Sequence, residues 1–308
     1  NQIVINGTLN LNSNLDFLGC TEIRFGANGN IKTNSFNLSC YTSTLKGCSN
    51  YMWKKIEINN TTTQVTLHEF WGGKTLIYDA EFGILNTSGG KIQAFNTEFI
   101  NNYRGIAVRN AIPAFFEVYN TGFYSNSTLK LSTIANPIPI MNAGIELTDV
   151  FNTSANPITI GKVFSTRTNS NYFGYGSDNS LGAGIVIKDA SVKVLNSDFR
   201  ISYTYGSGYV GIGSGIHAHR TTANAMLEVG DGTPQGLNNF KTGLVGVNQA
   251  FTMNVSIRKN YFERLTTAFF ASLFNHSANI TFNDNTAYSP GVTQFGVLIG
   301  TSNNSVIE

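Results

Sequence analysis

One short pattern recurs along the chain with a fixed internal spacing, and it constrains the fold more than any other feature. Each clear copy starts with an apolar residue that alternates with other residues, has Asn or Lys at its fifth position and ends with Phe, seven residues after its start. These copies are I-Q-A-F-N-T-E-F from Ile92, F-E-V-Y-N-T-G-F from Phe116, V-K-V-L-N-S-D-F from Val192 and V-S-I-R-K-N-Y-F from Val255. Alternation with a period of two is typical of β-strands and not of helices.

A second apolar segment follows most copies, and it usually begins with Gly. These segments are G-I-A-V-R at Gly105, G-I-E-L-T at Gly144, G-I-V-I-K at Gly184, G-I-H-A-H at Gly215 and the looser G-L-V-G-V at Gly243. Asn and Asp, which fill most fifth positions of the pattern, tolerate left-handed backbone angles and suit a recurring tight turn. The predicted unit is therefore strand, Asn turn, Phe, short link, Gly, strand.

The spacing of the copies predicts a solenoid. Copies start at residues 92, 116, 158, 192, 227, 255 and 280, so the shortest step is 24 residues and the middle steps are longer. A repeat of this length has an apolar edge that it cannot bury alone, and stacking the repeats makes one continuous core. We therefore expect an all-β chain that forms a parallel β-solenoid, with loops inserted into the middle coils and internal ladders of Asn and Phe. A β-sandwich is the alternative, because short alternating strands with turns fit it too.

Composition agrees with this fold and excludes several functional classes. Only 12% of the 308 residues are charged, the net charge is +2, and 41% of the residues are hydrophobic. An apolar fraction of this size supports a large core and argues against disorder. Because the chain has no basic run and no long apolar stretch, the sequence predicts no nucleic-acid partner and no membrane span.

The three cysteines, Cys20, Cys40 and Cys48, lie in the first fifty residues. Three sites allow three pairings with one thiol left over, and we favour one disulfide in an exported protein over three buried reduced thiols. We divide the chain into N-terminal coils that hold these cysteines, residues 1–72, and a main β-helix, residues 73–308. Since neither end shows an evident terminal cap, we expect a fragment of a longer polypeptide.

The run I-N-G-T-L-N-L near the start and the stretch M-W-K-K-I-E-I at Met52–Ile58, together with the later N-S-D-F and G-I units, carry a family resemblance. They resemble the right-handed parallel β-helix regions of large secreted proteins of Bacteroidota, many of them cell-surface proteins that use type IX secretion. The resemblance covers nearly the whole chain. It implies an extracellular or cell-surface location, transit through the secretion machinery and flanking domains. It does not choose between adhesins, structural stalks and polysaccharide-active enzymes.

Side chains that alternate with the buried ones on the post-Gly strand are expected to face outward. One outward column is Ala107, Glu146, Val186, His217, Val245 and Phe270, and the next is Arg109, Thr148, Lys188, His219, Val247 and Ser272. The three insertions, at about 124–143, 166–183 and 200–214, all fall between the Phe and Gly positions. Loops at one corner of consecutive coils become neighbours, so we expect them to form a wall beside the polar members of these columns.

Tyrosines in these loops suggest a ligand. A tyrosine ring has a flat apolar face with a hydroxyl group, which suits stacking on sugar rings. The candidate ligand-binding residues are Tyr172, Tyr175, Tyr203, Tyr205, Tyr209, Glu146, Lys188, His217 and His219. The expected partner is a polysaccharide or another cell-surface ligand. The alternative is that the tyrosines only fix the loops to the solenoid.

The sequence predicts no metal, no cofactor and no catalytic residue. His217 and His219 have the H-x-H spacing of metal ligands, but Lys188 lies between them and Glu146, and a cation there opposes metal binding. We therefore expect a non-catalytic adhesin or rigid extracellular segment that binds glycans at the middle-coil loops. The alternative is a polysaccharide lyase or epimerase that acts on an acidic glycan through Lys188 and His219.

Overall fold

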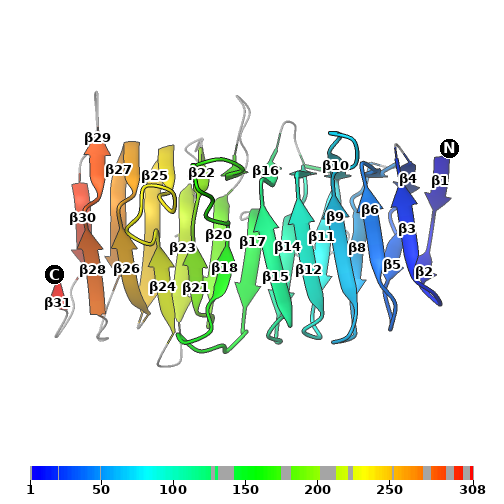
Figure 1. Cartoon of the computed structure of the whole chain (residues 1–308), viewed down its shortest axis with the longest axis horizontal. Helices are drawn as coiled ribbons and strands as arrows, with labels where there is room; N and C mark the ends of the chain where they lie inside the picture. Colours follow the sequence, from blue (N-terminus) through cyan, green and yellow to red (C-terminus); the bar gives the residue numbers. More distant parts are fainter. Residues whose placement is uncertain are drawn as a thin grey trace.

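The computed structural model is an elongated stack of β-strands, with β1 (Gln2–Ile5) and β31 (Val306–Ile307) at opposite ends of its long axis (Figure 1). The described residues are 2–19, 21–48, 50–125, 129–130, 142–174, 182–201, 213–220, 225–251, 253–272, 279–288, 295–300 and 306–307. Each helix or strand assigned within these ranges is a β-strand, and the strands of successive coils pair in parallel. The chain is a right-handed parallel β-helix, as predicted.

Each coil has three strand positions, and strands at the same position pair from coil to coil. The first position is occupied by β1, β4 (Glu22–Phe25), β7 (Thr44–Gly47), β10 (Thr75–Tyr78), β13 (Thr97–Ile100), β16 (Gly122–Tyr124), β19 (Asn171–Phe173), β22 (Ser197–Phe199) and β29 (Thr286–Tyr288). The second is occupied by β2 (Thr8–Asn10), β5 (Asn30–Lys32), β8 (Trp53–Ile58), β11 (Ala80–Asn86), β14 (Arg104–Arg109), β17 (Ala143–Thr148), β20 (Ala183–Lys188), β23 (Ser214–Arg220) and β30 (Phe295–Gly300). The long strands β25 (Asn239–Phe251) and β27 (Tyr261–Ser272) span both positions.

The third position forms two separate sheets. One contains β3 (Leu15–Leu18), β6 (Leu38–Tyr41), β9 (Gln64–His68), β12 (Lys91–Phe95) and β15 (Phe115–Tyr119). The other contains β18 (Ile158–Ile160), β21 (Val192–Val194), β24 (Met226–Val229), β26 (Asn254–Arg258), β28 (Asn279–Asn283) and β31. We call the outer sides of the three strand positions the first, second and third faces.

The phenylalanines that close the repeat stack along one line inside the solenoid. The ladder consists of Phe99, Phe123, Phe173, Phe199, Phe240 and Phe262, whose successive ring centroids are 4.6–5.0 Å apart with interplanar angles of 3–10°. Each ring is at most 2% exposed. A single line of stacked rings confirms the predicted Phe ladder and excludes the β-sandwich, in which these rings would lie on two facing sheets.

The recurrent glycine is required because a ladder ring packs against it. A methyl group on Gly184 would lie 2.6 Å from the Gly215 carbonyl oxygen and 2.7 Å from the Phe199 ring. These distances are shorter than side-chain contacts allow. The glycines that meet a ladder ring in this way are Gly83, Gly105, Gly144, Gly184, Gly215 and Gly246.

One member of this glycine series corrects the sequence prediction. Gly243 was expected to open the second strand, but the structure places Gly246 against the ladder. The outward columns therefore shift by three residues in that coil. Asn248, and not Val245, pairs with His217, and Ala250, and not Val247, pairs with His219.

Left-handed backbone angles recur at the predicted Asn turn. The residues are Asn96, Asn120, Asn196, Lys259 and Asp284, with φ between 45° and 54°. In two coils the left-handed residue is a glycine one position earlier, Gly161 or Gly230. Asp231, the fifth residue of the copy that starts at Leu227, therefore does not have the turn role predicted for Asn and Asp at that position.

An internal row of amides, interrupted by Ser197, lies one position later in the repeat than predicted. Asn260 accepts the backbone N–H of Asn238 at 3.1 Å and donates to the Val229 carbonyl at 2.9 Å. Asn171 and Asn238 make the equivalent pairs of bonds in their own coils. Each of these side chains thereby satisfies buried backbone groups of the turn.

The middle insertion is divided in a way that the sequence did not predict. It was expected over 166–183 as one loop, but Asn171–Phe173 forms β19 and pairs with both β16 and β22. Tyr172 therefore lies on a strand and not in a loop. Most of the other two predicted insertions lies outside the described residues.

The expected disulfide is wrong. Cys40 is fully buried beside Phe17, Cys48 is exposed, and both thiols are free. Any disulfide among the three cysteines needs at least one of these two. Cys20 lies outside the described residues. Strand pairing also continues across the division at residue 72, since β7, β8 and β9 pair with β10, β11 and β12.

Candidate functional site

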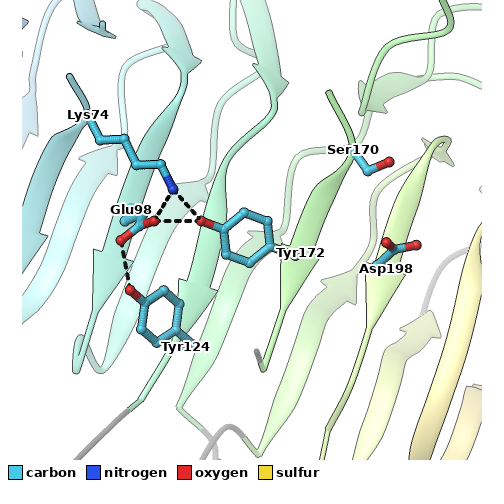
Figure 2. A pocket seen from close by; sticks show the side chains of 6 residues that line it. All are labelled: Lys74, Glu98, Tyr124, Ser170, Tyr172 and Asp198. Atoms are coloured by element: carbon cyan, nitrogen blue, oxygen red, sulfur yellow. Dashed lines mark hydrogen bonds and ion pairs between the residues drawn. The ribbon is translucent and has the colours of Figure 1, made fainter. Parts of the chain in front are cut away.

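A groove of about 500 Å³ lies on the first face. It is lined by residues of five successive coils, Lys74, Glu98, Tyr124, Ser170, Tyr172 and Asp198. At about 4.8 Å per coil, the groove extends for about 19 Å along the solenoid axis. Figure 2 shows Lys74, Glu98 and the two tyrosines gathered together, with Ser170 and Asp198 apart from them; Ser170 directly precedes β19, and Asp198 lies on β22.

Tyr172 reaches Glu98 across the coil between them because that coil has a glycine at this position. Glu98, Gly122 and Tyr172 occupy one register position on β13, β16 and β19. A methyl group on Gly122 would lie 2.3 Å from the Tyr172 ring. The ring therefore lies over Gly122 and donates its hydroxyl to the Glu98 carboxylate at 2.7 Å.

Three donors hold the Glu98 carboxylate. Tyr172 donates to Oε1 and Tyr124 to Oε2, each at 2.7 Å, and Lys74 forms an ion pair with Oε1 (Figure 2). Burial opposes ionisation, but the three donors outweigh it and hold the pKa of Glu98 below its ordinary value. Burial and the hydrogen bond to this carboxylate raise the pKa of Tyr124. The cluster therefore combines a fixed anion with a neutral tyrosine donor.

Asp198 supplies a second carboxylate to the groove. It forms an ion pair with Arg167 and accepts a hydrogen bond from Asn239 Nδ2 at 2.8 Å. Its strand is three coils from that of Glu98, a separation of about 14 Å. The catalytic carboxylates of glycosidases lie about 5–9.5 Å apart. The groove therefore suits binding rather than hydrolysis by this pair.

The second face has an anion of a different kind. Glu146, on β17, is 4% exposed and forms ion pairs with both Arg104 and Arg109. Burial opposes its ionisation, but the two arginines outweigh it and hold the pKa of Glu146 below its ordinary value. Each carboxylate oxygen already has a guanidinium partner, so the role of Glu146 is to pair with these two arginines and not to bind a ligand.

Lys188 also has a partner of opposite charge, Asp149. Its Nζ lies 2.9 Å from Asp149 Oδ1, and this hydrogen bond raises the pKa of Lys188. A lysine that acts as a general base needs its pKa lowered towards neutrality. The shift at Lys188 has the opposite direction.

His217 and His219 lie side by side on β23, with ring centroids 5.7 Å apart. Burial, followed by the charge of the adjacent imidazole, lowers the pKa of His217 to about 4. Burial and then Lys188 lower the pKa of His219. Within the described part of the chain, the buried Nδ1 atoms of both rings and the buried Oδ1 of the neighbouring Asn248 have no hydrogen-bond partner. Both imidazoles are therefore neutral at pH 7.

The structure divides the predicted site residues between two faces. Tyr172 lines the groove on the first face, whereas Glu146, Lys188, His217 and His219 lie on the second face and do not line the groove. The other four predicted residues, Tyr175, Tyr203, Tyr205 and Tyr209, lie outside the described residues.

Sequence reasoning missed five groove residues, Lys74, Glu98, Tyr124, Ser170 and Asp198. The predicted columns followed only the second strand of the unit. Glu98 and Asp198 each stand directly before a ladder phenylalanine, in N-T-E-F and N-S-D-F. Because neighbours of a buried strand residue face outward, the same alternation rule would have found these two carboxylates.

No protein-family model, no curated protein and no solved structure matches the chain. The described residues contain no group of three His, Cys, Asp or Glu side chains that could hold a metal ion. In the same ranges, no helix is long and apolar enough to cross a membrane. The evidence on function therefore comes from the geometry of the two faces.

Proposed function

We propose that the chain is a non-catalytic binding segment, an adhesin or rigid spacer, that holds a polysaccharide in the groove on the first face. The observation that carries this proposal is a pair of tyrosine rings beside fixed carboxylates in one shallow groove. Tyr124 and Tyr172 have ring centroids 6.3 Å apart and an interplanar angle of 26°. Their apolar surfaces suit the C–H faces of sugars, and carboxylates accept hydrogen bonds from sugar hydroxyls.

The proposal includes a secreted or cell-surface location. Its support is the resemblance to β-helix regions of Bacteroidota proteins that use type IX secretion, together with the low content of charged residues. Flanking domains of a longer chain would then supply attachment to the cell.

The alternative is a polysaccharide lyase or epimerase on the second face. Its support is His219, a neutral imidazole that is able to accept a proton, near the Lys188 cation. We favour binding because the Lys188 charge is already matched by Asp149, whereas this chemistry needs a cation free to neutralise the uronate carboxylate.

Substitution of one groove tyrosine tests the binding function. Tyr172→Ala should weaken polysaccharide binding about tenfold, the effect of losing roughly 1.4 kcal/mol of contact. The matched control is Tyr119→Ala, because Tyr119 is also half-buried but packs against Phe95 of the third face, with ring centroids 4.7 Å apart. Affinity electrophoresis in gels that contain neutral or acidic polysaccharides, followed by calorimetry, measures the effect. Unchanged binding by Tyr172→Ala, or equal loss in both variants, would remove the groove as the site.

A further inference from the structure

The loop between β9 and β10 carries the most exposed tryptophan that the structure describes. Trp71 is 93% exposed, and its ring centroid lies 4.6 Å from that of Phe70. The other tryptophan, Trp53, is fully buried. Removing the exposed apolar surface of a tryptophan from water is favourable, so a ligand that covers Trp71 would bind more tightly. Trp71 is therefore a strong candidate for a contact residue.

Thr42 of the preceding coil fixes this loop. Phe70 donates its backbone N–H to Thr42 Oγ1 at 2.6 Å, and the Thr42 hydroxyl lies 2.7 and 3.1 Å from the carbonyl oxygens of Phe70 and Gly73. A methyl group on Gly73 would lie 2.3 Å from Thr42 Cγ2. The close approach of Thr42 to the loop thus requires glycine at position 73.

The backbone of Trp71 is in an unusual conformation. Its φ is 53°, in the left-handed region that bulky residues rarely adopt. Such a conformation persists where the surrounding structure determines it, and it occurs often at binding sites. Together with the Thr42 contacts, it indicates that the loop presents Trp71 in one fixed orientation.

The loop leads directly into the groove. Lys74, three residues after Trp71, pairs with Glu98, and its Nζ lies 3.3 Å from the Tyr172 hydroxyl. Three residues of extended chain separate α-carbons by about 11 Å at most. Trp71 is therefore close to the end of the groove formed by the β10 coil.

We propose that Trp71 is a further binding position of this groove, and that the ligand is an extended, uncharged polysaccharide parallel to the solenoid axis. The proposal rests on the polysaccharide-binding function proposed above. The length of the groove, five coils, favours a chain over a single sugar. The ion pairs of Lys74 with Glu98 and of Arg167 with Asp198 favour an uncharged ligand, because these cations are already matched. A fixed tryptophan adds contact area with little loss of conformational freedom on binding.

Tryptophan fluorescence tests the proposal, because the difference between the wild type and Trp71→Phe isolates the signal of Trp71. The probes are a disaccharide and a hexasaccharide of each of three neutral polymers, β-1,4-glucan, β-1,3-glucan and β-1,4-xylan, and a hexamer of galacturonate. We expect one neutral hexasaccharide to shift the Trp71 emission to shorter wavelength and to protect it from iodide. Its disaccharide should bind in the groove without this shift. Trp71→Ala should weaken binding of that hexasaccharide about tenfold and leave the disaccharide unchanged.

The outcomes separate the two proposals. If no saccharide binds the wild type, both the proposed function and this inference fail. If a hexasaccharide binds in a Tyr172-dependent manner but Trp71→Ala binds it equally well, only this inference fails. Tighter binding of the galacturonate hexamer would overturn the uncharged ligand. A Trp71 shift with phosphatidylcholine vesicles, and with no saccharide, would make the loop a membrane contact instead.

Thr42 provides a second variant that leaves the tryptophan in place. Thr42→Ala should weaken hexasaccharide binding and leave the disaccharide unchanged, because the loop loses its anchor. Thr42→Ser keeps the hydroxyl and should restore binding. Thr42→Ala with wild-type affinity for the hexasaccharide would show that fixation of the loop has no role.

Discussion

Glu98 on the first face, which is partly buried, and Glu146 on the second face, which is buried, are both anions with lowered pKa values, but different donors hold them. Two arginines occupy Glu146, whose side chain is 6% exposed, whereas one lysine and two tyrosine hydroxyls occupy Glu98, which is 14% exposed. Guanidinium groups cover the carboxylate, whereas tyrosines place flat apolar rings beside it. The type of donor thus decides whether an anion on this fold belongs to a closed surface or to a groove.

Removing the two carboxylates should give the largest contrast in stability. Glu146→Ala should lower the free energy of unfolding by about 3 kcal/mol, because it leaves two arginines without their buried partner. Glu98→Ala should cost only about 1 kcal/mol, because its tyrosine and lysine donors can turn to water. Urea unfolding followed by circular dichroism measures both values. Equal losses would contradict the difference between the two faces.

As the pH falls, the first loss of folding stability should come from His217 on the second face. Because the folded pKa of His217 is about 4 against an ordinary 6.5, the folded state binds fewer protons than the unfolded chain in this range. The stability due to neutral His217 is therefore complete above pH 6.5 and is lost as the pH falls towards 4, at a cost of about 3 kcal/mol. The contributions of Glu98 and Glu146 are lost at lower pH, as each carboxylate is protonated below its ordinary pKa of 4.5.

The variant His217→Gln separates these two ranges of pH. It should flatten the dependence of stability on pH between 6.5 and 4.5 and leave the loss at lower pH in place. Thermal unfolding at a series of pH values measures the slope. A slope equal to that of the wild type would show that His217 is not the group that titrates there.

The interior was predictable from the sequence because its determinants are local. A phenylalanine seven residues after a strand start marks the ladder without any knowledge of distant contacts. The same rule missed Phe173 and Phe240, because additional residues separate them from Ile158 and Leu227, the starts of their copies. It also chose Gly243 over Gly246 because each glycine is followed by an apolar residue, Leu244 or Val247, and only packing against Phe262 selects the second.

The groove was less predictable because it depends on the register between coils. Tyr172 and Glu98 are 74 residues apart in sequence and meet only because Gly122 lies between them without a side chain. The seventh position of the repeat identifies both carboxylates as outward-facing. It does not show that a tyrosine two coils away reaches one of them.

Tyr172→Phe should sharpen the account of Glu98 at a smaller energetic cost. The variant keeps the ring over Gly122 and removes one of the three donors, so we expect a loss of stability of about 1 kcal/mol. It should also raise the pKa of Glu98, because the Tyr172 hydrogen bond helps to lower it. Carbon-13 NMR titration of the carboxylates measures the shift, with Tyr119→Phe as the control. An unchanged Glu98 titration would mean that this hydrogen bond is not formed.

Lys188→Met should have the smallest effect, and it decides between the binding function and the lyase alternative. The Lys188 side chain is 35% exposed, and an ion pair of this kind contributes about 0–1 kcal/mol, so we expect a change in stability below about 0.5 kcal/mol. Polysaccharide binding in the groove should not change, because Lys188 lies on the other face. Incubation with alginate, pectate and chondroitin, followed by absorbance of unsaturated products, tests for turnover. Turnover by the wild type that Lys188→Met abolishes would move the functional site to the second face, since the groove residues would still be intact in that variant.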